Sequence, residues 1–203
     1  FEMDEITRAA KQDLPSRNDT IGIEASELYT GRQQDAIKNA VRQLRADGHQ
    51  VQRYFISAGF GLVQEDERLP PYEVTFSGMS VSEIRDRSEQ LGIQDDLHQL
   101  LDQLEYDIVF FALGSDYYSS IDIDKTAQRI QPDRIGVVFN RDILNEQYEN
   151  IVSVSARTED AKRHETIVIG LKGVYLQNFA DNVRDAAELD PDSINILCRY
   201  VEE

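Results

Sequence analysis

Apolar residues recur along this chain in two patterns: a helical spacing of three or four residues, and short unbroken runs. Residues 35–46 follow the first pattern, placing Ile37, Val41 and Leu44 on one face before a stop at Asp47-Gly48, and this predicts a helix. The run YDIVFFAL at 106–113 follows the second and predicts a fully buried strand. Further helices are predicted at 80–92, 94–104, 171–188 and 191–202. Further strands are predicted at 51–57, 135–139, 151–155 and 166–169.

Alternation of strands with helices is typical of an α/β protein. We therefore expect one compact α/β domain over residues 1–203, long enough to bury a single core. Its central sheet should be mostly parallel or mixed, with about five strands and with helices on both faces. The last part of the chain, 171–203, should be helical. Ser80 and Glu83 form a capping box that fixes the start of the helix at 80–92.

Backbone-shaping residues are concentrated between Tyr54 and Phe76, in the segment YFISAGFGLVQEDERLPPYEVTF. The predicted strand at 51–57 ends here in four small residues, which are Ser57, Ala58, Gly59 and Gly61. Small residues let a backbone approach a ligand closely, and exposed amides there could hold a carboxylate or phosphate. A strand exit needed only for folding explains the same pattern equally well.

The strand at 106–113 also ends in a glycine, Gly114, which Asp116 and Tyr117 follow. In open α/β sheets the ligand crevice lies outside the carboxyl ends of the strands. We therefore expect the ends of the strands at 51–57 and 106–113 to converge on one crevice.

Familiar catalytic and cofactor motifs are missing from the sequence. It contains no P-loop, no G-x-G-x-x-G, no G-x-S-x-G and no zinc-ligand spacing, so we expect neither a metal nor a cofactor. His49, His98 and His164 lie far apart in polar positions and are expected on the surface. Cys198 lies in the apolar stripe of the last helix, which favours a buried structural thiol over a nucleophile.

Charge and cysteine content narrow the classes of partner and compartment. The formal net charge is −17, and the 21 basic residues comprise 16 Arg and 5 Lys. A lysine-poor acidic surface is typical of a halophilic cytoplasm, although an ordinary acidic protein explains it equally well. Such a charge disfavours binding nucleic acid through a broad basic face, so any basic patch must be small. One cysteine and no apolar run of membrane-spanning length predict a cytoplasmic protein with no disulfide and no membrane contact.

Four segments of the chain resemble the peroxide-stress YaaA-type proteins and the related uncharacterised bacterial and archaeal domains that share their S-A-x-x-G-L-V…P-Y motif. The segments lie between residue 11 and residue 118, and they are Lys11–Pro15, ELYTG at 27–31, ISAGFGLVQEDERLPPYEVTF at 56–76 and DIVFFALGSDYY at 107–118. The resemblance implies a compact α/β fold and an association with DNA protection under oxidative stress. It also implies that Lys11, Tyr29, Thr30 and Tyr72 belong to the binding site.

Three functions remain open at this point. The first is a nucleic-acid-associated domain of stress response or genome protection that binds DNA, a nucleotide or a nucleobase in the crevice at the strand ends. Lys11, Arg53 and Lys172 are its candidate basic contacts. Bases could stack on Tyr29, Tyr72 or Tyr117.

The second function is an enzyme that acts on a nucleobase or nucleotide, for example at an N-glycosidic bond. A carboxylate would then activate water or stabilise a sugar cation, and Asp116 and Glu73 are the candidates. Asp116 could equally be the N-cap of the following helix. The third function is a non-catalytic subunit that binds another protein.

Overall fold

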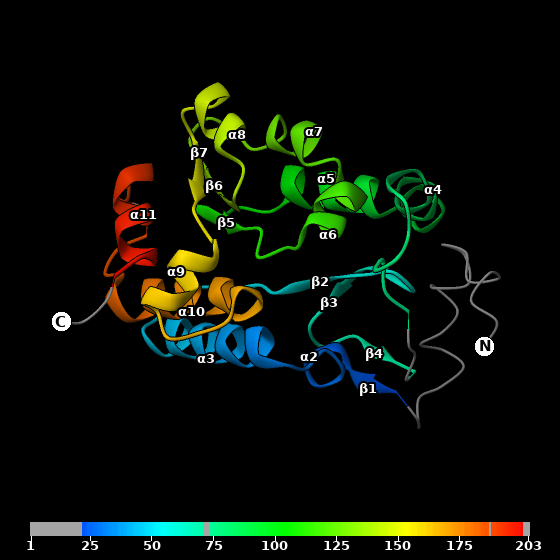
Figure 1. Cartoon of the computed structure of the whole chain (residues 1–203), viewed down its shortest axis with the longest axis horizontal. Helices are drawn as coiled ribbons and strands as arrows, with labels where there is room; N and C mark the ends of the chain where they lie inside the picture. The colour runs from blue at the N-terminus through cyan, green and yellow to red at the C-terminus, as the bar shows by residue number, and fades with distance from the viewer. Residues whose placement is uncertain (1–21, 71–73, 187, 201–203) are drawn as a thin grey trace. The chain divides into compact units, whose positions relative to one another are not determined.

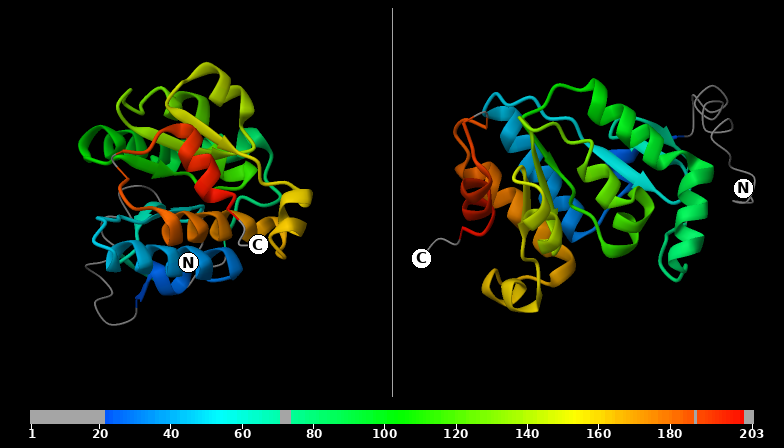
Figure 2. Two further views of the ribbon diagram at one scale, coloured as in Figure 1. Left: turned by 90° about the vertical axis from the view of Figure 1, so that its left-hand side faces the viewer. Right: turned by 90° about the horizontal axis from the view of Figure 1, so that it is seen from above.

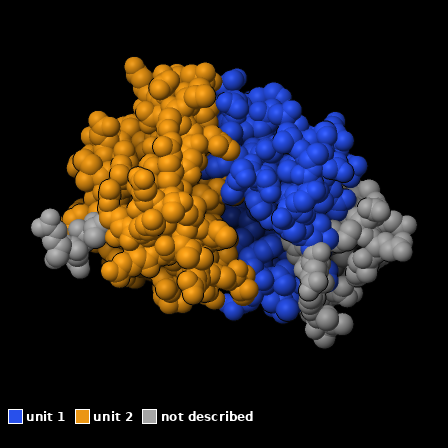
Figure 3. Space-filling view, viewed as in Figure 1, with its two compact units in different colours: residues 1–29, 52–104, 114–129 blue, residues 30–51, 105–113, 130–203 orange. Residues whose placement is uncertain are grey.

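The computed structural model describes residues 22–70, 74–186 and 188–200. The chain divides into two compact units, coloured separately in Figure 3. Unit 1 takes in the described residues up to Tyr29 together with Gln52–Leu104 and Gly114–Arg129, and unit 2 takes in Thr30–Val51, Glu105–Leu113 and the chain from Ile130 onward. The prediction of a single domain over 1–203 stays a prediction.

Unit 2 contains a parallel sheet of three strands, β5 (Ile108–Phe110), β6 (Ile135–Phe139) and β7 (Ile151–Val154), in the order β5-β6-β7 (Figure 1). Val137 of β6 pairs with Phe110 of β5 and with Val152 of β7. The strands are almost entirely apolar, as expected when both faces of a parallel sheet are covered.

Two helices of fifteen residues, α3 (Arg32–Ala46) and α10 (Val168–Asn182), lie side by side in unit 2 (Figures 1 and 2). Gly173 permits this contact, because a Cβ atom there would lie 2.6 Å from the carbonyl oxygen of Gln33 and 2.8 Å from Cβ of Ala36. The helices run in the same direction, since Gly170 faces Arg32 and Gly173 faces Gln33 and Ala36. Both helices therefore begin at the same end of unit 2.

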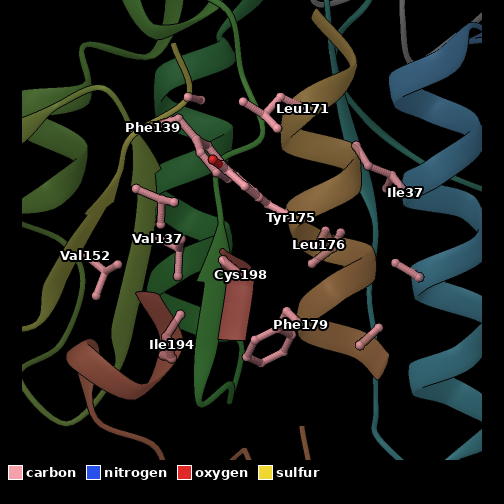
Figure 4. Close-up of a cluster of buried hydrophobic side chains, with 14 of the residues drawn as sticks. Ile37, Val137, Phe139, Val152, Leu171, Tyr175, Leu176, Phe179, Ile194 and Cys198 are labelled. Carbon is pink, nitrogen blue, oxygen red and sulfur yellow. The ribbon is translucent and has the colours of Figure 1, made fainter. Parts of the chain in front are cut away.

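The core of unit 2 forms where α10 lies between the sheet and α3 (Figure 4). Tyr175 and Phe179 point from α10 toward the strands, and the Tyr175 ring stacks on Phe139 of β6 at 6.3 Å between centroids. Ile37 of α3 contributes from the opposite side of α10. Three shorter helices complete the unit: α8 (Asp142–Gln147), α9 (Thr158–Arg163) and α11 (Pro191–Cys198).

Unit 1 is built on two small antiparallel sheets. The hairpin of β2 (Tyr54–Ser57) and β3 (Gly61–Gln64) pairs Ser57 with Gly61 across a three-residue turn. The second sheet pairs β1 (Ile23–Glu24) with β4 (Arg68–Leu69). The intervening helix α2 (Ala25–Leu28) is tied to the loop after β3, since the amide of Ala25 donates to the carbonyl of Glu67 at 2.8 Å.

Four helices complete unit 1: α4 (Val81–Leu91), α5 (Ile93–Gln103), α6 (Ser115–Ile121) and α7 (Ile123–Ala127). The capping box predicted for α4 is confirmed, because the amide of Glu83 donates to Ser80 Oγ at 3.3 Å and the amide of Ser80 donates to Glu83 Oε2 at 2.7 Å. These hydrogen bonds to Ser80 lower the pKa of the Glu83 carboxyl group.

The α/β class is confirmed, but the single sheet of about five strands is wrong for the described residues. The strand predicted at 51–57 forms an antiparallel hairpin with residues 61–64, where no strand is predicted from the sequence. The strand predicted at 166–169 is wrong as well, since α10 begins at Val168. β-branched residues at 167–169 suggested a strand locally, but burial of the following residues on the sheet and on α3 favours a helix there.

Candidate functional site

The small residues Ser57, Ala58, Gly59 and Gly61 lie in and directly beside the turn of the β2–β3 hairpin, and all four are buried. The amides of Gly59 and Phe60 donate to Ser57 Oγ at 3.1 and 3.0 Å. These amides are occupied and buried, so the expectation of exposed amides that hold an anion is corrected. A short polar side chain satisfies them locally instead.

The close backbone approach at Gly61 is made to the chain itself. Gly61 has a φ of +78°, and a Cβ atom there would lie 3.0 Å from the carbonyl oxygen of Leu91 at the end of α4. The guanidinium of Arg87, also on α4, donates through Nε to the carbonyl of Ala58 at 3.0 Å. Packing of the turn on α4 therefore accounts for Gly61.

Tyr29 lies beside the same hairpin. Its ring is half-buried and stacks on Phe55 of β2 at 4.6 Å between centroids, and the guanidinium of Arg53 lies over the Phe55 ring at 4.6 Å. Thr30 is exposed and belongs to unit 2. A stack of this kind contributes to the packing of unit 1 and occupies one face of the Tyr29 ring.

Gly114, Asp116 and Tyr117 lie at the start of α6. Gly114 is the N-cap residue, so Asp116 belongs to the first turn and the N-cap interpretation of Asp116 is wrong. Its Oδ1 accepts from Ser115 Oγ at 3.4 Å. Tyr117 packs edge-on against Phe76 at 5.2 Å between centroids. The described contacts of Asp116 do not support a catalytic role. The candidates Lys11, Tyr72 and Glu73 lie outside the described residues.

The predicted crevice rested on β2 and β5 lying in one sheet, and they belong to different sheets. The parallel sheet of unit 2 has its strands in sequence order, so the three described strands contain no point at which the order reverses. Polar side chains nevertheless gather where its strands end, after Phe139 of β6 and after Val154 of β7. We call this place the carboxyl edge, and define it by Asn140, Arg141, Asp142, Ser155, Arg157 and Asp160.

A network of hydrogen bonds joins the ends of β6 and β7. The side chain of Asn140 accepts from the amide of Ala156 at 2.8 Å and donates to its carbonyl at 3.0 Å. The amide of Arg141 donates to Ser153 Oγ at 2.8 Å. Asp142 accepts from Ser153 Oγ at 3.0 Å and pairs with the Arg157 guanidinium at 3.1 Å. The two strand ends are thereby held in a fixed register.

Asp160 is the buried carboxylate of this edge. It accepts from Ser155 Oγ at 2.7 Å and from the amide of Arg157 at 3.0 Å, and Arg199 lies 3.6 Å away. Burial alone would raise the pKa of Asp160, but these hydrogen bonds and the nearby arginines hold it below its usual value. Asp160 is also the third residue of α9, where its carboxylate accepts from the amide of the N-cap residue Arg157, so it has a structural role.

α10 brings Lys172 to the carboxyl edge. One turn further along α10, Tyr175 donates from its hydroxyl to the carbonyl of Ser155 at 2.9 Å, and its ring stacks on Phe139. Burial is the main cause that lowers the pKa of Lys172, and the positive charge of Arg141 lowers it further. Within the described residues, Lys172 makes no hydrogen bond or ion pair that would offset this repulsion.

The other titratable groups singled out by the sequence are half-buried or buried. His98 is half-buried with Nε2 at 3.1 Å from Thr126 Oγ1, His164 packs edge-on against Tyr175, and His49 is half-buried as well, so the three histidines expected on the surface are only partly exposed. Cys198 is fully buried, as predicted, and burial raises the pKa of its thiol to about 12. No cluster of three or more His, Cys, Asp or Glu suited to a metal ion occurs in the part of the chain described.

Sequence analysis named Lys172 as a candidate basic contact. It did not name Arg141 or Arg157, which lie with Lys172 at the carboxyl edge. Their positions in the sequence indicate this place, because Arg141 follows the predicted strand at 135–139 and Arg157 follows the one at 151–155. The expectation that ligands bind beyond strand ends holds for these two strands as well as for those at 51–57 and 106–113.

None of the helices in residues 22–70, 74–186 and 188–200 has the length and apolar character needed to cross a membrane.

Neither the curated proteins nor the solved structures contain a match to the chain. A family of unknown function, DUF6884, matches residues 16–137. That match supports no link to the YaaA-type proteins, so this resemblance stays a prediction. Because more than half of its length is matched, the chain belongs to the DUF6884 family.

Proposed function

We propose that this protein is a nucleic-acid-associated domain, of the kind that serves stress response or genome protection, and that it binds phosphate groups of DNA or of a nucleotide at the carboxyl edge of β5–β7. One observation carries the proposal: half-buried Lys172 lies one turn before Tyr175, whose hydroxyl donates to Ser155 at the carboxyl edge where Arg141 follows β6. Two cations held near each other repel, and removal from water adds to the cost. An anion bound between them would offset both effects.

Phosphate suits this pair of side chains for chemical reasons. An arginine offers a planar fork of donors to phosphate oxygens, and a lysine offers a compact point charge. α10 begins one turn before Lys172, so the positive end of its dipole favours an anion at the same place. The small extent of the cationic group agrees with a chain of net charge −17, because a broad basic face is not required.

Fluorescence anisotropy of a short labelled DNA oligonucleotide, titrated with the protein over a series of salt concentrations, tests the proposal. Loss of a charge-assisted contact in Lys172→Gln should weaken binding about tenfold. The slope of log affinity against log salt should become shallower by about 0.7–0.9, the value for one phosphate contact.

Lys125→Gln is the matched control, since it removes the same charge from an exposed lysine of α7 that pairs with Asp122 at 2.8 Å. Its affinity and salt slope should equal those of the wild type. Equal binding by Lys172→Gln and Lys125→Gln, or no binding by the wild type at the lowest salt, would refute the proposal.

A further inference from the structure

Unit 1 contains a cavity of about 360 Å³ among the helices α4, α5, α6 and α7. Ten of the described residues line it, and all of them are polar except Gly92. Cavities that bind small molecules are usually lined mainly by apolar side chains, with a few polar groups that fix the orientation of the ligand. A polar lining throughout favours a ligand that forms hydrogen bonds and ion pairs on all sides.

A buried hydrogen bond fixes the base of this cavity. Ser88 of α4 and Ser120 of α6 both line it, and they are 4% and 2% exposed. The hydroxyl of Ser88 donates to the carbonyl of Ser120, and the hydroxyl of Ser120 donates to the carbonyl of Tyr117 at 2.8 Å. These contacts hold α4 against α6, so the cavity is formed before any ligand binds.

Arg85 and Glu89 add one cation and one anion to the wall that α4 provides. They lie four residues apart, so they share one face of the helix with their Cβ atoms about 5–6 Å apart. Neither side chain forms a hydrogen bond or an ion pair with another of the described residues. The positive charge of Arg85 acts on Asp122, but that carboxylate pairs with Lys125 at 2.8 Å. Two opposite charges on one wall therefore face the cavity without a close partner among the residues described.

We infer that this cavity binds a small zwitterion, namely a free amino acid with a polar side chain. The guanidinium of Arg85 would bind the carboxylate of the ligand through two parallel hydrogen bonds, and the carboxylate of Glu89 would bind its ammonium group. Both groups of an amino acid are attached to one carbon atom, so side chains from adjacent turns of one helix can contact them together. The serine and glutamine residues of the lining suit a ligand side chain that forms hydrogen bonds.

Ligands of other charge match this cavity less well. An anion would leave Glu89 without a partner and would also meet Asp95, whereas a cation would leave Arg85 without one. A neutral ligand would leave both charges unpaired. The cavity lies in unit 1 and Lys172 lies in unit 2, so amino-acid binding and phosphate binding can each be tested without the other.

Heteronuclear NMR of the isotope-labelled full chain, titrated with L-glutamine, tests this assignment. Saturable shifts should appear at the amides of the residues that line the cavity. Two analogues that each lack one charge are the ligand controls: N-acetyl-L-glutamine keeps only the carboxylate, and L-glutaminamide keeps only the ammonium group. Each analogue should bind at least about tenfold more weakly than L-glutamine, because one charged contact is lost.

Arg85→Gln and Glu89→Gln should each weaken binding of L-glutamine about tenfold. Arg85→Gln should still bind L-glutaminamide as the wild type does, since the contact with the ammonium group remains. Asp86→Asn is the matched control, because Asp86 is an exposed carboxylate of the same helix that does not line the cavity. Its affinity for L-glutamine should equal that of the wild type, and all three variants should show the wild-type unfolding transition.

Three results would overturn the inference. The first is the absence of saturable shifts up to about 10 mM L-glutamine. The second is equal binding of L-glutamine and N-acetyl-L-glutamine, which would mean that the cavity holds an anion only. The third is equal weakening by Glu89→Gln and Asp86→Asn, which would reduce the effect to a general loss of negative charge from α4.

Discussion

Lys172 is half-buried on α10, and both this burial and the positive charge of Arg141 disfavour its ammonium form. Its pKa is lowered from 10.5, so the unfolded chain binds a proton more tightly at this residue than the folded chain does. The resulting penalty to folding is fully present at neutral pH. It disappears as the pH rises from the folded pKa toward 10.5, because stability rises with pH wherever the unfolded state binds more protons.

Lys172→Met should therefore stabilise the protein at neutral pH while it weakens oligonucleotide binding. Methionine keeps a flexible chain of similar length and removes the charge. Urea unfolding of wild type and variant should show a higher midpoint for the variant, and the difference should shrink as the pH approaches 10.5. A lower midpoint for Lys172→Met at neutral pH would mean that Lys172 is stabilised by its surroundings, contrary to this account.

At the scale of single elements, the β2–β3 hairpin depends on its contact with α4. Gly61 has a φ of +78° and faces the Leu91 carbonyl, whereas Gly78 has a φ of +87° with nothing within 4 Å. Alanine at either position would be strained by about 1–2 kcal/mol. Only at Gly61 would the added methyl group also push against a backbone atom that cannot move alone.

Gly61→Ala should lower the free energy of unfolding by about 1–3 kcal/mol more than Gly78→Ala does. Chemical denaturation of both variants measures this difference directly. Gly78→Ala supplies the strain of the left-handed backbone without the overlap, so it isolates the packing contribution. Equal destabilisation by the two substitutions would show that the hairpin turn does not need its close approach to α4.

At the scale of the whole molecule, 38 acidic residues against 21 basic ones create repulsion between carboxylates. Dissolved salt screens this repulsion between exposed groups. Rising sodium chloride concentration should therefore raise the thermal unfolding midpoint by about 3 °C or more, which corresponds to roughly 1 kcal/mol for a chain of this size. The same salt series should weaken oligonucleotide binding.

Thermal melts across the salt series check the stability effect, and melts near the pI of 4.5 are the control. Net charge is small there, so added salt should change the midpoint little. A midpoint that does not respond to salt at neutral pH would show that carboxylate repulsion is unimportant in the folded state.

Local patterns predicted most of the elements near their observed positions. The helix expected at 80–92 is α4 at Val81–Leu91, and the strand expected at 135–139 is β6 with the same bounds. Both depend on contacts between near neighbours, a capping box in α4 and an unbroken apolar run in β6. The strand expected at 166–169 failed because contacts with distant residues of α3 and the sheet decide the conformation there.

The sequence alone determined the α/β class, the acidic charge, the buried thiol of Cys198 and the start of α4, because each follows from composition or from residues close together in the chain. Tertiary structure alone decided which strands share a sheet. It paired β2 with β3, packed the glycine-rich turn on α4, and placed the positive charge of Arg141 where it lowers the pKa of Lys172 on another element. Strand pairing and interactions between charges join residues that are far apart in sequence. The periodic pattern of apolar residues along the chain does not predict such contacts.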